Sequence, residues 1–241
     1  MDIVYLVKTD PENDSEELRY SLRSLKNVPH GKVILVGEKP DWATNITFIP
    51  IAQSMTKNEN VMMNLRAAAR SDDISEEFVM MNDDFFIMKP ILEIPRTNFG
   101  TMKSIIEQYE QRYSEVTHYI SSMKKLYDLL RKREIAEPLS YELHAPMILS
   151  KSKVQELYRD APKPFYQFRS FYGNYFNIGG ETVPDVKIFI DARHNDPLYR
   201  EDSQVYLEQQ ILLSSTGGAF KKGLAGDFVR AQFPEKSEYE L

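Results

Sequence analysis

The chain has 241 residues, 42% of them hydrophobic and 27% charged, and a formal net charge of −6, which argues against a generally basic nucleic-acid-binding protein. The absence of cysteine excludes disulfides, thiolate nucleophiles and iron–sulfur clusters, and the four histidines show no HExxH motif and no paired metal spacing. No apolar run approaches the ~18 residues that cross a bilayer and no signal-peptide pattern opens the chain, so we expect a cytoplasmic protein without a membrane span.

The first part of the chain alternates short apolar runs with amphipathic segments. The runs are rich in Val, Ile and Phe, and they predict strands at residues 2–7, 32–37, 46–51 and 77–81. Ser15 opens a predicted helix, because its hydroxyl can cap amides and leucines follow at helical spacing. A second helix is predicted over 60–70. This alternation predicts an α/β fold with βαβ units and a mostly parallel sheet flanked by helices.

A long amphipathic segment occupies residues 101–133, with apolar residues at steps of three and four and no proline. It predicts one long helix, or a helical hairpin broken near Ser121 and Ser122. We expect a helical insertion at 101–134 that packs one face on the α/β core. Its carboxyl-terminal end is basic. This end is either a solvated helix face or a surface that contacts an acceptor or a phosphate weakly. The residues are Lys124, Lys125, Arg131, Lys132 and Arg133.

The remainder of the chain is less regular. It predicts helices at 151–159 and 205–213, a short strand at 187–190 and a last helix that ends at Pro234. Neither an internal repeat nor a linker is visible. We therefore expect a single domain, 1–241, that contains the helical insertion.

The sharpest motif is an acidic doublet, Asp83 and Asp84, directly after the strand predicted at 77–81. In an open α/β sheet the ligand crevice lies beyond the carboxyl ends of the strands. Adjacent carboxylates stay ionised beside a cation, and Mg²⁺ or Mn²⁺ bound to a diphosphate would supply one. The alternative is a turn in which the aspartates cap backbone amides.

Three other places near the predicted crevice carry candidate residues. Asp10, in the loop after the first strand, suits a contact to a base or ribose, although a plain surface loop fits equally. Arg19, on the following helix, can reach a phosphate or serve solubility. Lys57 and Asn60 flank a helix start, where free amides favour anions.

Two residues in the second half of the chain are candidates for chemistry. His144 could act as a general base on an acceptor hydroxyl near neutral pH, or it could be structural. Arg169 lies among aromatic residues, where a buried guanidinium needs an anionic partner. That partner would be a phosphate or a core aspartate.

Several short motifs, taken in order, resemble the conserved regions of the Stealth proteins, sugar-1-phosphate transferases of capsular polysaccharide synthesis related to N-acetylglucosamine-1-phosphotransferase. The matches span nearly the whole chain in the order of that family. They lie at residues 2–5 (DIVY), 17–25 (ELRYSLRSL), 78–86 (FVMMNDDFF), 144–146 (HAP) with 168–169 (FR), and 227–240 (DFVRAQFPEKSEYE).

The resemblance implies a glycosyltransferase-A-like, Rossmann-type nucleotide-sugar fold, a divalent metal near Asp84, and roles for His144 and Arg169 at the reacting phosphate. Two departures remove oxygen ligands. Leu65 stands where the family carries a glutamate, and Ser214 and Ser215 stand in the stretch where it carries an Asn-Asp pair. These departures favour ordinary glycosyl transfer on the same fold, in a compact, divergent branch of a bacterial or phage type.

Our primary hypothesis from the sequence is therefore a glycosyltransferase that uses a UDP-sugar with Mn²⁺ or Mg²⁺. The acceptor would be a hydroxyl of a glycan or of DNA with hydroxymethylated bases. Asp83 and Asp84 would hold the metal and diphosphate. The alternatives are Stealth-type transfer of sugar plus phosphate, and a non-catalytic nucleotide-sugar-binding module. No GxGxxG follows a strand and no GK[ST] loop is present, which argues against hydride transfer and Walker-type phosphotransfer.

Overall fold

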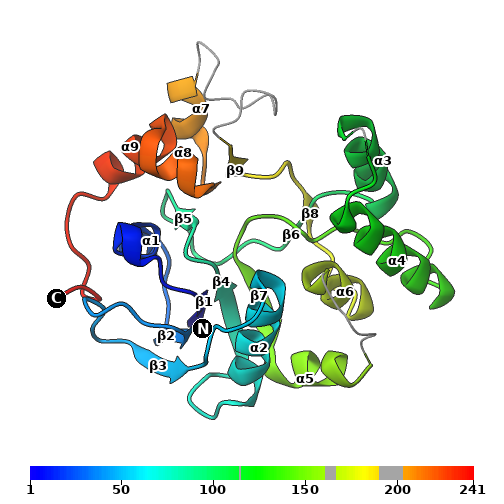
Figure 1. Ribbon diagram of the computed structural model, residues 1–241, viewed down its shortest axis with the longest axis horizontal. Helices are drawn as coiled ribbons and strands as arrows, with labels where there is room; N and C mark the ends of the chain where they lie inside the picture. Colours follow the sequence, from blue (N-terminus) through cyan, green and yellow to red (C-terminus); the bar gives the residue numbers. More distant parts are fainter. Residues whose placement is uncertain (114, 161–166, 190–202) are drawn as a thin grey trace. The chain divides into compact units, whose positions relative to one another are not determined.

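A computed structural model describes residues 1–113, 115–160, 167–189 and 203–241. The chain forms two compact units (Figure 1). Unit 1 comprises residues 1–94, 144–152 and 186–241, and unit 2 comprises 95–143 and 153–185. Within the described ranges, no helix combines the length and the apolar composition needed to cross a membrane.

Unit 1 is built on a five-stranded sheet in the order β3-β2-β1-β4-β7 (Figure 1). The first four strands in this order are parallel, and β7 runs antiparallel to β4. Every residue of β1 is buried, because a central strand of a parallel sheet is covered on both faces. The strands are β1 (Asp2–Val7), β2 (Val33–Gly37), β3 (Thr47–Pro50), β4 (Glu77–Met81) and β7 (Met147–Ser150).

A second sheet in unit 1 begins immediately after the first. Only Asn82, Asp83 and Asp84 separate the end of β4 from β5 (Phe85–Ile87). The strand β5 pairs antiparallel with β10 (Leu212–Ser215), and β10 pairs parallel with β9 (Lys187–Ile188). The acidic doublet therefore occupies the crossing from one sheet to the other.

The helices of unit 1 fix the elements that surround this crossing. Helix α2 packs on β1 and β2, and it begins with a capping box between Thr56 and Glu59. Helix α1 packs against β5. The elements are α1 (Glu16–Ser24), α2 (Lys57–Arg70), α7 (Ser203–Gln209), α8 (Gly217–Lys222), α9 (Leu224–Gln232) and the 3-10 turns η1 (Pro11–Asn13) and η2 (Leu25–Asn27); α5 (Lys151–Asp160) begins in unit 1 and continues into unit 2.

Unit 2 is mainly helical and has its own core. Helices α3 (Met102–Arg112) and α4 (His118–Lys132) pack together around Ile105, Ile106 and Met123, and α4 also packs on α6 (Phe168–Tyr175). Two short parallel strands, β6 (Thr97–Asn98) and β8 (Glu181–Thr182), join its ends.

The predicted α/β class and mostly parallel sheet are confirmed, with local differences. Ser15 precedes α1 as expected, but its hydroxyl accepts from the amide of Asp10 (3.0 Å) and makes no cap bond. The helical hairpin breaks between α3 and α4, earlier than Ser121. The helix predicted over 205–213 ends at Gln209, because the next apolar residues pair with β5 as strand β10. Ile190, the last residue of the predicted strand 187–190, lies outside the described residues.

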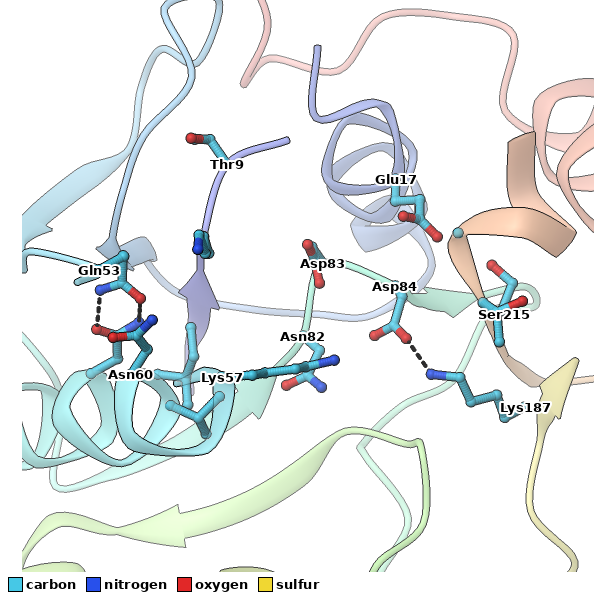
Figure 2. Close-up of a pocket in the computed structure, with 16 residues that line it drawn as sticks. Thr9, Glu17, Gln53, Lys57, Asn60, Asn82, Asp83, Asp84, Lys187 and Ser215 are labelled. Atoms are coloured by element: carbon cyan, nitrogen blue, oxygen red, sulfur yellow. Dashed lines mark hydrogen bonds and ion pairs between the residues drawn. The ribbon is translucent and has the colours of Figure 1, made fainter. Parts of the chain in front are cut away.

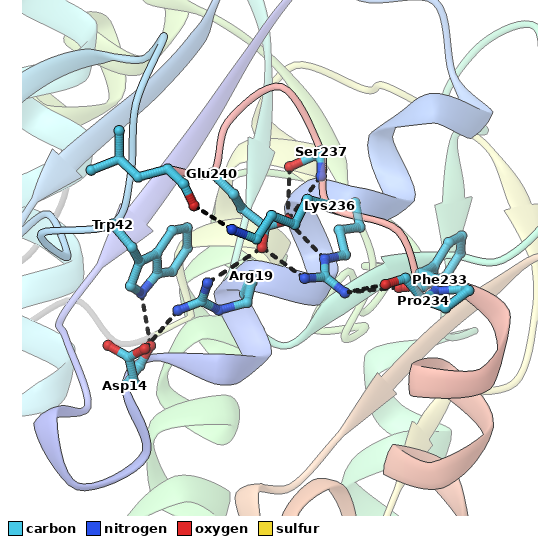
Figure 3. A network of polar contacts seen from close by, with 10 residues as sticks. Asp14, Arg19, Trp42, Phe233, Pro234, Lys236, Ser237 and Glu240 are labelled. Carbon is cyan, nitrogen blue, oxygen red and sulfur yellow. Dashed lines mark hydrogen bonds and ion pairs between the residues drawn. The ribbon is translucent and has the colours of Figure 1, made fainter.

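A buried carboxylate, Glu240, ties the carboxyl-terminal segment to helix α1 (Figure 3). Its side chain is fully buried and accepts two hydrogen bonds from Arg23 (2.7 and 2.8 Å) and one from Arg19 (3.3 Å). Arg19 also lies over the ring of Trp42, 4.2 Å from its centroid. Burial alone would raise the pKa of Glu240, but hydrogen bonds from Arg23 and Ser237 outweigh it and the pKa is lowered.

We predict that Glu240→Gln lowers the free energy of unfolding by about 3 kcal/mol near neutral pH, since it leaves two arginines without their buried anion. Because the folded pKa of Glu240 lies below its unfolded value, the stabilisation is present above about pH 4.5 and is lost as the pH falls. Urea denaturation at several pH values measures both effects.

Glu238→Gln, close by on the same segment, is the control and should change stability by less than about 0.5 kcal/mol. Equal losses in the two variants, or a Glu240→Gln effect that persists undiminished in acid, would contradict the assignment.

Candidate functional site

A cavity of about 560 Å³ lies in unit 1 at the carboxyl ends of the parallel strands. This edge of an open α/β sheet is where such folds bind ligands. Its walls come from the ends of β1 and β4, the start of α2, helix α1, β9, and the β10–α8 turn (Figure 2). The lining residues are Leu6, Lys8, Thr9, Glu17, Gln53, Lys57, Asn60, Val61, Asn64, Asn82, Asp83, Asp84, Lys187, Ser215, Thr216 and Gly217.

The acidic doublet is held in this cavity by the residues that follow it. Phe85 and Phe86 are each 1% exposed, and the carbonyl of Phe85 accepts a hydrogen bond from the hydroxyl of Ser21 on α1. The amide of Phe85 donates to the carbonyl of Asn82 (3.3 Å), which closes the turn. The position of the doublet is therefore fixed, because moving it out of the cavity would also pull two buried aromatic rings out of the core.

Two residues from the second sheet hold Asp84. The ammonium of Lys187, the first residue of β9, lies 2.8 Å from Oδ2 of Asp84 (Figure 2). The hydroxyl of Ser214 donates to the same oxygen at 3.3 Å. The side chains of Lys187 and Asp84 are only 13% and 16% exposed. The ion pair is thus shielded from solvent and holds the side chain of Asp84 in one orientation.

A third carboxylate, Glu17, faces the cavity from α1 (Figure 2). Burial, together with the negative charges of Asp83 and Asp84, raises its pKa to about 7 against the opposing effects of Lys187 and Lys221. Burial and the charge of Asp84 also raise the pKa of Asp83. The three acids therefore repel one another in a partly desolvated site, as is common where a protein binds or converts a ligand.

Three buried oxygens at the cavity have no hydrogen-bond partner among the described residues. They are Oε1 of Glu17, Oδ1 of Asp84 and Oγ of Ser215. Ser215 is 1% exposed, so water has little access to it. Unpaired buried acceptors are costly, so there is a driving force for these side chains to rotate toward the cavity, where a ligand that donates hydrogen bonds would satisfy them.

The described residues do not fit a divalent metal at the doublet. They contain no group of three His, Asp or Glu side chains placed to hold a metal ion. Oδ2 of Asp84 is already bound to an ammonium, whose positive charge opposes a second cation at the same carboxylate. At the two departures from the Stealth pattern, Leu65 is fully buried in the core and Ser214 donates to Asp84.

Four of the sequence-predicted binding residues line the cavity: Lys57, Asn60, Asp83 and Asp84. The side chain of Asn60 exchanges hydrogen bonds with the backbone of Met55 (3.0 and 3.1 Å), so its amide holds the loop before α2. Lys57 is the first residue of α2, at the end of the helix that attracts anions.

Two predicted nucleotide contacts are placed elsewhere. Asp10 forms an exposed ion pair with Lys221 (2.8 Å), which lowers the pKa of Asp10. Arg19 is bound to Glu240 and Asp14 on the side of α1 that meets the carboxyl-terminal segment. Arg19 thus has its anionic partners within the protein, and its contact to a nucleotide stays a prediction.

The predicted roles of His144 and Arg169 stay predictions. Neither residue lines the cavity, and Arg169 belongs to α6 of unit 2. The basic end of α4 is partly engaged inside unit 2. Lys124 pairs with Glu110, Arg131 donates to carbonyls just beyond its own helix, and Arg133 lies over two aromatic rings of α6, while Lys125 and Lys132 are exposed.

Sequence reasoning missed Glu17, Lys187 and Ser215. Glu17 carried a usable signal, since it lies on the helix that follows the first strand, whose carboxyl end was expected to border the crevice. Lys187 carried none, because β9 has two residues and no sequence periodicity shows which strand it joins.

The chain matches no protein-family model and no curated protein. Among solved structures it is similar to the galactosyltransferase LgtC, crystallised with donor and acceptor sugar analogs. The match covers 98% of this chain and 96% of that one, with 12% identity and a TM-score of 0.47. At this level we transfer no residue role from it, and the resemblance to Stealth proteins stays a prediction.

We predict that Glu17→Gln stabilises the protein by about 1 to 2 kcal/mol near pH 8, because it removes a carboxylate whose ionised form is disfavoured by burial and by the negative charges of Asp83 and Asp84. The folded pKa of Glu17 lies above its unfolded value, so the cost of ionising it appears as the pH rises from about 4.5 through 7. The two proteins should therefore converge in acid. Denaturant titrations near pH 8 and pH 4 measure the difference.

Glu12→Gln, on the exposed turn η1, is the matched control and should leave stability unchanged at both pH values. A Glu17→Gln protein that is less stable than wild type near pH 8 would show that the carboxylate is needed to hold the fold.

Proposed function

We propose that the cavity of unit 1 binds a nucleotide sugar and that the protein transfers the sugar to an acceptor hydroxyl. The observation that carries this proposal is the presence, in one cavity, of lysine ammonium groups beside acceptor oxygens that lack partners. The first feature suits a phosphate and the second suits a ligand rich in hydroxyl groups. A nucleoside diphosphate sugar has both.

The lining residues suggest how such a ligand would lie. The doublet lies between two groups of polar side chains in Figure 2, with Thr9 and Gln53 on one side and Glu17 and Ser215 on the other. Gln53 is fixed by two amide hydrogen bonds to Asn64 (2.8 and 3.3 Å). We assign the Gln53 side to the nucleoside, and the side with the unpaired oxygens to the sugar.

Lysine side chains in the cavity favour a diphosphate between these two ends. Lys57 opens α2, Lys187 stands beside the doublet, and Lys8 follows β1. Ammonium groups bind phosphate oxygens as point charges, and the amino-terminal end of α2 adds to the positive potential. The carboxylates of the doublet would accept hydrogen bonds from ribose or sugar hydroxyls.

We assign proton transfer to Glu17, which faces the cavity from α1. Its pKa of about 7 lies near physiological pH, where a general base works best. In the proposed step, the acceptor oxygen bonds to the anomeric carbon while the bond from that carbon to the diphosphate breaks. The electron pair leaves with the nucleoside diphosphate, and the acceptor proton passes to Glu17.

The test is a screen of nucleotide sugars, with product analysis. Release of a nucleoside diphosphate supports glycosyl transfer. Release of a nucleoside monophosphate supports the Stealth-type alternative, in which sugar and phosphate move together. Binding without turnover across the set supports a non-catalytic module.

We predict that Glu17→Gln lowers kcat about 10²-fold or more and removes the rise of kcat/KM with pH near 7. Because the same change should stabilise the fold, lost activity cannot be attributed to unfolding. Steady-state kinetics from about pH 5.5 to 8.5 measure both parameters.

Glu16→Gln is the matched control, since Glu16 is adjacent on α1 but pairs with Arg230 (2.9 Å) and does not line the cavity. It should retain most activity and the same pH profile. A Glu17→Gln enzyme with wild-type kcat and pH profile would remove Glu17 from the mechanism.

A further inference from the structure

One of the two carboxylates of the doublet, that of Asp84, is paired with a cation from within the protein, Lys187. Its Nζ lies 2.8 Å from Oδ2 of Asp84, and both side chains are largely shielded from solvent. This lysine comes from the second sheet, far from the doublet in sequence (Figure 2). It supplies a cation at the place where the sequence alone suggested a divalent metal.

The backbone around Lys187 fixes the position of its ammonium. Lys187 pairs with Ser214 in the register of β9 and β10, and the amide of Ser214 donates to the carbonyl of Val186 (3.2 Å). The next residue, Ile188, is fully buried in a core cluster with Phe86. Lys187 is therefore built into a strand, unlike a lysine on an exposed helix, whose ammonium moves freely.

An ammonium so placed can bind a further anion. Lysine has three N–H donors, of which one is used by Asp84. Asp84 thus serves to orient the ammonium toward the cavity, where Lys57 supplies a second positive charge. A divalent ion would need several oxygen ligands and would lie next to this positive charge.

We propose that Lys187, oriented by Asp84, takes the place of a divalent metal and neutralises the diphosphate of the donor. This inference rests on the proposed function and deepens it, because it makes donor binding independent of metal. Lys187 is a binding residue in this scheme, and Asp84 positions it.

The experiment measures binding of UDP, GDP, CDP and ADP to the full chain by calorimetry, once with EDTA and once with Mn²⁺. We expect at least one nucleotide to bind, with affinities in the two buffers that agree within about threefold. Lys187→Met should weaken that nucleotide about tenfold or more, and Lys187→Arg should recover part of the loss. The matching nucleoside, which has no phosphate, should bind both proteins equally.

Two further variants control for folding and for general charge. Lys187→Met leaves Asp84 without its cation, so the double variant Asp84→Asn/Lys187→Met removes both charges and should fold while still binding the nucleotide weakly. Lys32→Met, an exposed lysine just before the amino end of β2 and bound to the carbonyl of Asp73 (3.3 Å), should bind it like wild type.

The outcomes separate this inference from the proposed function. Nucleotide binding that requires Mn²⁺ and disappears in EDTA overturns the role of Lys187 and leaves the function standing. Wild-type affinity in Lys187→Met and in the double variant also overturns it. If no nucleotide binds the wild-type protein in either buffer, both proposals are overturned.

Discussion

Repulsion between neighbouring carboxylates is the constraint around which the cavity of unit 1 is arranged. Asp83 and Asp84 follow β4 directly, and Glu17 adds a third acid from α1. Ionised groups this close, in a partly buried site, cost free energy that must be recovered elsewhere. It is recovered by the buried rings of β5 on one side and by the ammonium of Lys187 on the other. Repulsion among the carboxylates of the site therefore lowers the stability of the fold, and the packing of the surrounding core compensates for it.

The cavity draws its polar groups from separate parts of the chain. The parallel sheet brings the ends of β1 and β4 to one edge, and the second sheet delivers Lys187 and Ser215 to the same place. Lysine side chains and acceptor oxygens without partners therefore belong to the lining of one cavity. In the proposed function, this combination selects for a ligand with anionic and hydroxyl-rich parts.

The sequence predicts four of the five strands of the first sheet and misses β7, because the four are short apolar runs bounded by turn residues; β1, β2 and β4 are largely buried, whereas β3 at the edge is not. It also places the doublet at the sheet edge, since β4 runs directly into Asn82. It predicts a strand at 187–190, where β9 begins, but it predicts a helix over the first residues of β10 and does not show their pairing, because β10 joins β5, more than a hundred positions earlier in the chain. That pairing brings Lys187, Ser214 and Ser215 to the doublet. The sequence therefore identifies the doublet itself but not the residues that contact it.

Helix α1 is held on two sides by different means. One side presents Glu17 to the cavity, and the other presents Arg19 and Arg23 to the carboxylate of Glu240, one residue before Leu241. The backbone amide of Leu241 itself donates to the carbonyl of Trp42 (2.9 Å). Any change that breaks the contacts of Glu240 would therefore also loosen α1, and with it the wall of the cavity that carries Glu17.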